Sequence, residues 1–141
     1  MRNSWLLSIL LLFGCRTNIQ TTFLSEVCIQ PYKNYQYKTC HDIQFSINKA
    51  PFYIPKGFTT DLASIPRVAW PFMSPAHSSL MRPAIVHDWF YRMTCDFNRK
   101  EIDLIFYNML LNDGITPFRA GLMYMSVRAF GRSSFRRDYC E

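Results

Sequence analysis

Two predicted helices carry polar side chains that could do chemistry in otherwise apolar surroundings. The first holds an adjacent pair, His87 and Asp88, with Tyr91 one helical turn further on. On a helix His87 and Tyr91 share one face, and Asp88 is turned about 100° away from them. The second, predicted over residues 98–111, carries Asp103 in an apolar interior. Because an unpaired buried charge costs several kcal/mol, we expect His87, Tyr91 and Asp103 to meet across two antiparallel helices.

The spacing His-Asp-x-x-Tyr-Arg, followed by Asn, basic residues and Ile-Asp-x-x-Phe, resembles the two catalytic helices of secreted phospholipase A₂, especially its bacterial branch. The resemblance covers about residues 84–111. It implies that His87 is the general base, Asp103 the carboxylate that orients it, Tyr91 the hydroxyl that steadies that carboxylate, and Asp88 a bidentate calcium ligand. These roles agree with the chemistry, because histidine titrates near neutral pH and calcium prefers oxygen ligands.

The phospholipase pattern is incomplete in this chain. The Gly- and Cys-rich calcium loop that precedes the catalytic helix in phospholipase A₂ has no counterpart here, and the cysteines that flank that helix are also missing. A calcium site therefore needs ligands from another part of the chain.

A second resemblance extends over more of the sequence. The matching positions are residues 57–67, residues 82–91, Asp103 and residues 123–131. They closely resemble domain-of-unknown-function family 1353, small proteins common in phages and bacteria. The resemblance implies a shared fold and polar site but no activity. Asp61 is expected at this site as a metal ligand, and Thr60 and Ser64 as oxyanion or loop residues, because they place side-chain oxygens where phospholipase A₂ places its loop carbonyls. An Asx-turn or helix cap without a ligand is the alternative.

The N-terminus has the features of an export signal. A charged start with Arg2 precedes a short apolar run over residues 5–13, too short for a spanning helix. The following Leu12-Phe13-Gly14-Cys15 resembles a lipobox, which implies acylation of Cys15 and cleavage before it. By resemblance to Gram-negative sorting rules, Arg16 in place of Asp favours the outer membrane, on its periplasmic side. The alternative is a buried helix with an incidental cysteine.

The other four cysteines are expected to form two disulfides, as is typical of small exported domains. Three pairings are open, and we favour Cys28 with Cys40 and Cys95 with Cys140. A zinc site is the rival interpretation. Zinc is disfavoured because no two of these cysteines have the close spacing of a zinc knuckle.

The predicted fold class is α+β, a small antiparallel sheet followed by three helices and tied by disulfides. Residues 1–14 are expected to be the signal peptide, 15–25 a tether, and 26–141 one globular domain. Strands are predicted at four places: residues 27–29, 35–37, 43–47 and 52–54. A long loop is predicted from 57 to 79. Helices are predicted with Pro83 at the first position and an end near Met93, over 98–111, and from Thr116 to Gly131.

The chain carries a net charge of +6, and the excess is concentrated near the C-terminus. On a continuous helix, Arg128, Arg132 and Arg136 would form a stripe at i, i+4 and i+8. Anionic phospholipid is the expected partner of this stripe in a lipid-anchored protein; an ordinary solvated face is the alternative. Nucleic acid is disfavoured because export would take the domain away from it.

Three functions remain open from the sequence. The first is a metal-assisted hydrolase that acts on membrane lipid esters. The second is a non-enzymatic, phage-type envelope lipoprotein that binds a partner, in superinfection exclusion or in outer-membrane disruption at lysis. The third, a cell-wall peptidase or amidase, is disfavoured because His41 and His77 are isolated and no second histidine completes a zinc motif. A hydrolase requires convergence of the polar residues, whereas a binding module requires an exposed apolar patch.

Replacement of Cys15 tests the anchor. Cys15→Ser removes the acylated thiol, so we expect an uncleaved or soluble protein that no longer incorporates labelled fatty acid. Fractionation of cells and acyl labelling measure this. Unchanged membrane fractionation together with undiminished labelling would refute the lipoprotein hypothesis.

Overall fold

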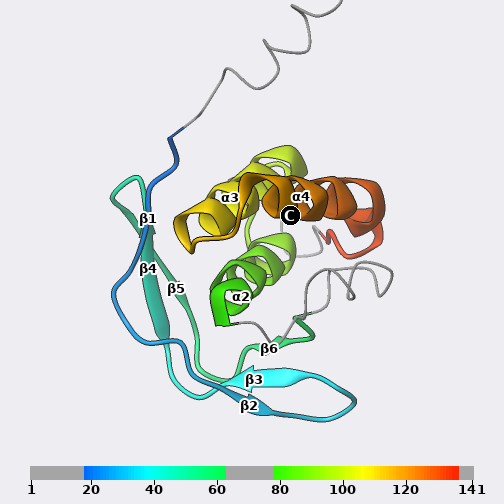
Figure 1. Ribbon diagram of the computed structural model, residues 1–141. Helices are drawn as coiled ribbons and strands as arrows, with labels where there is room; N and C mark the ends of the chain where they lie inside the picture. Colours follow the sequence, from blue (N-terminus) through cyan, green and yellow to red (C-terminus); the bar gives the residue numbers. More distant parts are fainter. Residues whose placement is uncertain (1–17, 63–77, 137–141) are drawn as a thin grey trace, which may run out of the picture.

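The strands precede the helices along the chain, and together they form an α+β fold (Figure 1). The computed structural model describes residues 18–62 and 78–136. Within them, two antiparallel sheets have the orders β1-β4-β5 and β2-β3-β6. The strands are β1 (Thr21–Phe23), β2 (Ile29–Pro31), β3 (Tyr37–Thr39), β4 (Ile43–Ile47), β5 (Ala50–Ile54) and β6 (Thr59–Thr60). The helices are α2 (Ser78–Met93), α3 (Arg99–Asn112) and α4 (Pro117–Phe130), followed by the 3₁₀ turn η2 (Gly131–Ser133).

Strand β4 supplies the core face of the first sheet. Its apolar side chains alternate with polar ones, and Ile43, Phe45 and Ile47 are buried. β4 pairs with β5 through a two-residue turn in which Asn48 and Lys49 both have positive φ, at 48° and 71°. These values fit a type I′ turn, whose twist suits a hairpin.

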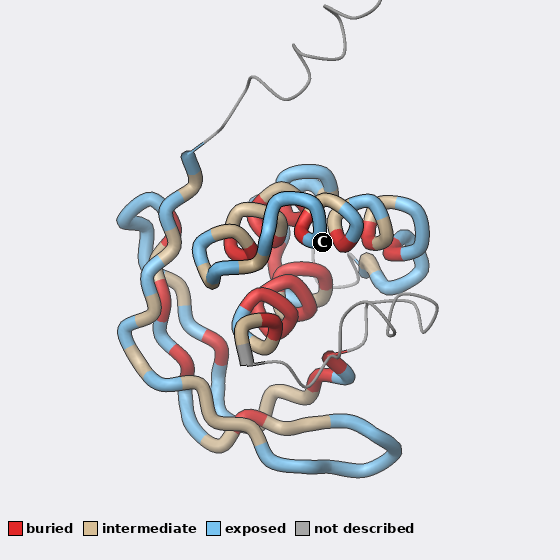
Figure 2. Tube along the Cα trace, viewed as in Figure 1, coloured by how far each residue is buried: buried red, intermediate tan, exposed pale blue. Residues whose placement is uncertain are grey.

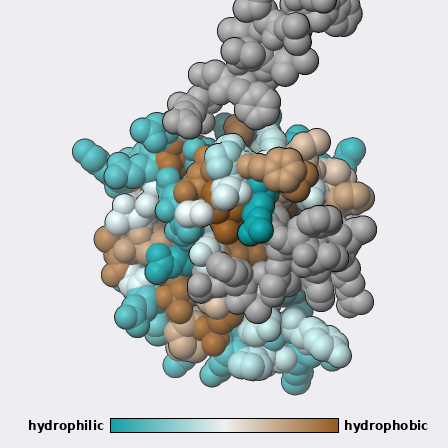
Figure 3. Space-filling model, viewed as in Figure 1, coloured by the Kyte–Doolittle hydropathy of each residue, from teal (hydrophilic) through white to brown (hydrophobic). Residues whose placement is uncertain are grey.

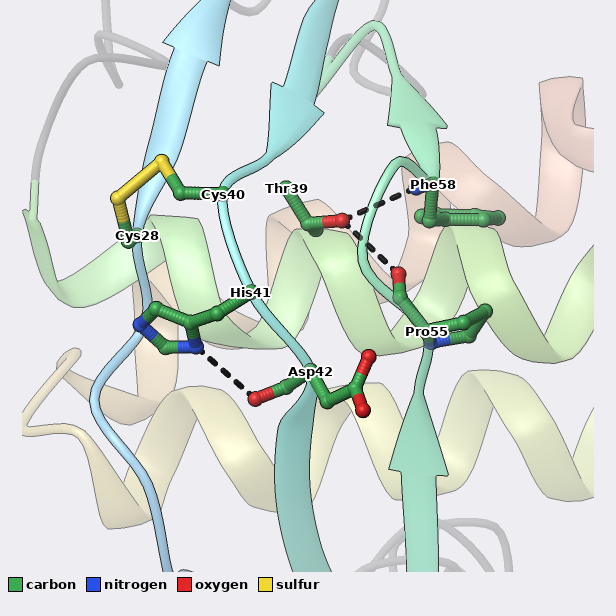
Figure 4. Close-up of a disulfide and its surroundings, with 7 residues drawn as sticks. All are labelled: Cys28, Thr39, Cys40, His41, Asp42, Pro55 and Phe58. Atoms are coloured by element: carbon green, nitrogen blue, oxygen red, sulfur yellow. Dashed lines mark hydrogen bonds between the residues drawn. A yellow bond between two sulfur atoms is a disulfide. The ribbon is translucent and has the colours of Figure 1, made fainter.

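The second sheet is fastened by a disulfide between Cys28 and Cys40, as we expected (Figure 4). Next to it, the buried Thr39 hydroxyl donates to the Pro55 carbonyl at 2.9 Å and accepts from the Phe58 backbone N–H at 3.0 Å. The hydroxyl of Thr39 is thereby satisfied inside the fold. Cys95 is also in a disulfide, while its expected partner Cys140 lies outside the described residues.

Helix α2 packs against α3 and contacts the β1-β4-β5 sheet through Phe90, and most of it is buried (Figures 1 and 2). The predicted start at Pro83 is wrong, because α2 begins at Ser78 and Pro83 lies inside it. The buried Leu80 explains the extra turn: it packs with Phe106 and Leu110 of α3. This packing stabilises a helical turn before Pro83, where the sequence rules start the helix only at the proline.

The other two helices agree with the sequence signals. Asn98 and Glu101 form the predicted capping box at the start of α3. Gly114, with φ of 87°, follows its end. Pro117 is the first residue of α4, and Gly131 caps its end.

Two strands lie where the sequence predicted irregular structure. β1 lies within residues 15–25, which we assigned to a tether, and it pairs with β4. β6 lies within the predicted loop 57–79 and pairs with β3. Both are too short for periodicity to show, and their partners are distant in sequence. In the described part of the chain, no helix combines the length and the apolar character needed to cross a bilayer.

The Cys28–Cys40 disulfide should stabilise the second sheet. It joins residues 12 positions apart, and a loop of this size is expected to contribute about 3 kcal/mol by restricting the unfolded chain. Cys28→Ser with Cys40→Ser should therefore lower the free energy of unfolding in urea by about that amount. A change below about 0.5 kcal/mol would show that the cross-link contributes little.

Candidate functional site

The site is built around the carboxylate of Asp103, which lies in the middle of α3 and is completely buried. Oδ1 accepts hydrogen bonds from His87 Nε2 at 2.8 Å and from the Tyr91 hydroxyl at 2.5 Å. Oδ2 accepts one from Arg128 Nη1 at 2.8 Å, and Arg99 Nε lies 3.8 Å away. Two helices, α2 and α4, thus supply hydrogen-bond donors to a carboxylate on α3. His87, Tyr91 and Asp103 lie together as the helix spacing predicts.

The balance of these contacts keeps Asp103 ionised. Burial raises the pKa of its carboxyl, but the hydrogen bonds from His87, Tyr91 and Arg128 outweigh burial, so the pKa lies below its ordinary value. The carboxylate is therefore a fixed negative charge inside the helical layer.

His87 is held in one orientation by this carboxylate. An ionised carboxylate can only accept, so Nε2 carries the proton of this hydrogen bond and Nδ1 is the basic nitrogen of the neutral ring. The ring also lies against Tyr91 and Phe106, with centroids 4.0 and 4.8 Å away. Within residues 18–62 and 78–136, no hydrogen bond is made to Nδ1. The His87 side chain is only 1% exposed.

Tyr91 acts as a neutral donor to the same oxygen. Burial, followed by the contact with Asp103, raises the pKa of its phenol far above the ordinary range, so the hydroxyl keeps its proton. Its position depends on Gly131, because a Cβ at that residue would lie 2.9 Å from the hydroxyl oxygen. Gly131, just after α4, therefore permits the close approach of Tyr91.

Arg128 is the site residue whose role the sequence analysis missed. We placed it in a surface stripe with Arg132 and Arg136, but α4 ends at Phe130 and only Arg128 is on the helix. Its guanidinium turns inward to Asp103, whereas Arg132 and Arg136 are exposed. The available signal was that the positions of the family resemblance include Arg128 and Gly131.

Asp88 belongs to a second polar cluster on the sheet side of α2. Its Oδ2 accepts a hydrogen bond from the Thr60 hydroxyl of β6 at 2.5 Å, and both residues are buried. The Thr60 hydroxyl also accepts from the Leu62 backbone N–H at 3.1 Å. Arg92 donates to the Thr59 carbonyl. This cluster joins α2 to β6.

The predicted calcium ligands are only partly brought together. Asp61 follows Thr60 directly but is exposed. The expected loop residue Ser64 and the expected lipid anchor Cys15 lie outside the described residues. Across the described ranges, no group of three or more His, Cys, Asp or Glu side chains could hold a metal ion. These residues alone do not fit a calcium site, and Asp88 is already bound to Thr60.

The pattern around the site matches that of a known family. A family model described as "Protein of unknown function (DUF1353)" matches residues 36–127. The chain belongs to this family. The matched range includes His87, Asp103 and, at its end, the Val127 that precedes Arg128. The DUF1353 assignment by resemblance is thus confirmed, and it adds no activity.

One similar curated protein is the "Uncharacterized protein y4iH" of Sinorhizobium fredii (strain NBRC 101917 / NGR234). It is 35% identical over 89 residues, which make up 60% of this chain and 36% of that protein. The chain therefore matches about a third of the length of this relative. No solved structure matches the chain.

The acid stability of the protein should report on Asp103. Its pKa is lower in the folded than in the unfolded chain, so its contribution is complete above the unfolded value of about 4 and is lost as the pH falls through the folded value. Asp103→Asn should lower the free energy of unfolding at pH 7 by about 3–5 kcal/mol. The difference from the wild type should shrink below about pH 4. Urea unfolding at several pH values measures both effects.

Asp113 provides a control, because its replacement by Asn should change the free energy of unfolding in the opposite direction. Burial raises the pKa of its carboxyl, and its Oδ2 is buried with no hydrogen-bond partner in the described structure. Asp113→Asn should therefore stabilise the protein at pH 7, with the gain vanishing in acid. Equal pH dependence of the two variants would contradict the assignment of the Asp103 charge.

Proposed function

We propose that the protein is a bacterial envelope lipoprotein, anchored through Cys15, that hydrolyses ester bonds of membrane lipids with His87 as general base. The observation that carries the proposal is the 2.8 Å hydrogen bond from His87 Nε2 to the buried Asp103 carboxylate. A histidine held in this way presents Nδ1 as its base, which is the arrangement that activates water in hydrolases.

His87 and Asp103, which we call the dyad, each have a defined task in this reaction. His87 Nδ1 takes a proton from water while the water oxygen attacks the ester carbonyl carbon. The imidazolium that forms is stabilised by the ionised Asp103. When the tetrahedral intermediate collapses, the bond from carbon to the alcohol oxygen breaks and His87 returns the proton to that oxygen. The products are a fatty acid and a lysolipid, and His87 is regenerated.

Tyr91 and Arg128 act through Asp103 and not on the substrate. Tyr91 fixes the oxygen that holds His87, and Arg128 fixes the other oxygen. With both oxygens held, the carboxylate cannot rotate, and the imidazole keeps one tautomer and one orientation. No step is assigned to calcium, because the described residues do not assemble a site for it.

A second candidate function is a non-enzymatic envelope lipoprotein that binds a partner. It is favoured by the almost complete burial of His87, at 2% exposure, and of Asp103, at 0%. In this alternative the network is an internal brace between three helices. The two candidates differ in what happens when the dyad is altered without loss of the fold.

Fatty-acid release from phospholipid vesicles tests the proposal. His87→Ala should lower the rate at least about a hundredfold, as expected for loss of a general base. His41→Ala is the matched control: His41 is exposed, and its ring nitrogen contacts the adjacent Asp42 carbonyl. Assays with calcium and with a chelator show whether a metal contributes.

Asp103→Asn tests whether the charge of the carboxylate serves catalysis as well as stability. It keeps the shape of the side chain but removes the charge that stabilises the imidazolium. A catalytic role requires loss of hydrolysis under conditions where circular dichroism shows a folded protein. If the folded wild type releases no fatty acid, with or without calcium, the hydrolase proposal is refuted and the binding module remains.

A further inference from the structure

The exposed side of α4 is unusually apolar for the surface of a small domain. Phe118, Leu122, Met125 and Ala129 recur at intervals of four, three and four residues, which places them on one face of the helix. We call these four residues the α4 outer face. Phe118 is 76% exposed, Leu122 40% and Met125 67%, and Phe130 at the end of the helix is 65% exposed.

The opposite side of α4 already fills the core. Ala120, Met123 and Val127 are completely buried against α2 and α3. A surface helix ordinarily turns polar residues to solvent, yet α4 is apolar on both sides. An exposed contiguous apolar patch of this kind marks an interaction surface. Figure 3 shows hydrophobic residues at the surface over the region where α4 lies in Figure 1.

The segment that carries this face has charges of one sign only. From Gly114 to Arg136 the chain contains no Asp or Glu. Arg119 follows Phe118 on α4 and is exposed, as are Arg132 and Arg136 beyond its end. A surface with an apolar centre and basic flanks is complementary to a negatively charged bilayer, into which apolar side chains insert while guanidinium groups contact lipid phosphates.

A second copy of the chain fits this face poorly. Two α4 outer faces in contact would bring the exposed arginines of both copies close together. Like charges at an interface cost association energy. The complementary charge favours a lipid surface over self-association.

We propose that the α4 outer face docks on anionic phospholipid and holds the domain against the membrane. The proposal rests on the membrane location in the proposed function, and it adds the partner and the orientation. α4 also carries Arg128, which binds Asp103, so the helix that contacts lipid is coupled directly to the candidate site.

Oxidation of methionine by hydrogen peroxide tests the docking, with an internal control. Met125 is 67% exposed on the outer face, and Met93, at the end of α2, is 46% exposed. Both should oxidise readily in free protein. The protein produced from the full-length sequence is mixed with vesicles of phosphatidylcholine alone or of equal parts phosphatidylcholine and phosphatidylglycerol. Mass spectrometry then follows both methionines.

We expect the oxidation of Met125 to slow at least about fivefold relative to Met93 on the anionic vesicles only. Combined replacement of Arg119, Arg132 and Arg136 by Gln should abolish this protection. The same relative rates on both kinds of vesicle would overturn the proposal. Protection that appears without vesicles would also overturn it, since another segment or a second copy would then cover the face.

The same samples distinguish this proposal from the hydrolase proposal. Protection of Met125 in a wild type that releases no fatty acid would support docking and refute hydrolysis. Hydrolysis without protection would refute docking and leave the His87 mechanism in place. His87→Ala should retain the protection, because His87 lies inside the helical layer and not on the outer face.

Discussion

The arrangement of the three helices depends on the burial of one negative charge. Asp103 has no solvent contact, and an uncompensated carboxylate in that position would be strongly destabilising. α2 supplies His87 and Tyr91, α3 carries the carboxylate itself, and α4 supplies Arg128. Each helix must therefore keep its rotation and height relative to the others. Apolar packing alone would tolerate sliding of these helices. The hydrogen bonds from His87, Tyr91 and Arg128 to Asp103 define one register.

The same requirement explains features outside the network. Gly131 lies after α4 where a Cβ would press on the Tyr91 hydroxyl, so the end of α4 is adapted to the network. The Tyr91 carbonyl accepts from the Arg136 backbone N–H at 3.1 Å, which brings the chain after η2 back over α2. On the other side of α2, Asp88 binds Thr60 of β6. Adjacent residues on α2 thus face the helical layer and the sheet, and each finds a polar partner.

The sequence predicted what is local and missed what depends on distant segments. The capping box at Asn98, the alternation in β4 and the shared face of His87 and Tyr91 all follow from spacing along the chain. The start of α2 was mispredicted because the packing of Leu80 against Phe106 and Leu110 stabilises a turn before Pro83. The arginine stripe was inconsistent with a helix end at Gly131, and the partner of Arg128 could be known only once α4 was placed against α3. β6 has two residues, too few for any periodicity, and its role appears only through pairing with β3.

Arg128 connects the inside of the domain to its surface. Its guanidinium neutralises Asp103 from one side, and its side chain is still 34% exposed. A close hydrogen-bonded ion pair strengthens when solvent is excluded from around it. Docking of α4 on a bilayer would remove water from the region next to this arginine and so tighten its contact with Asp103. The orientation of the carboxylate would then be fixed more firmly, so the proposed membrane contact would be coupled physically to the polar site.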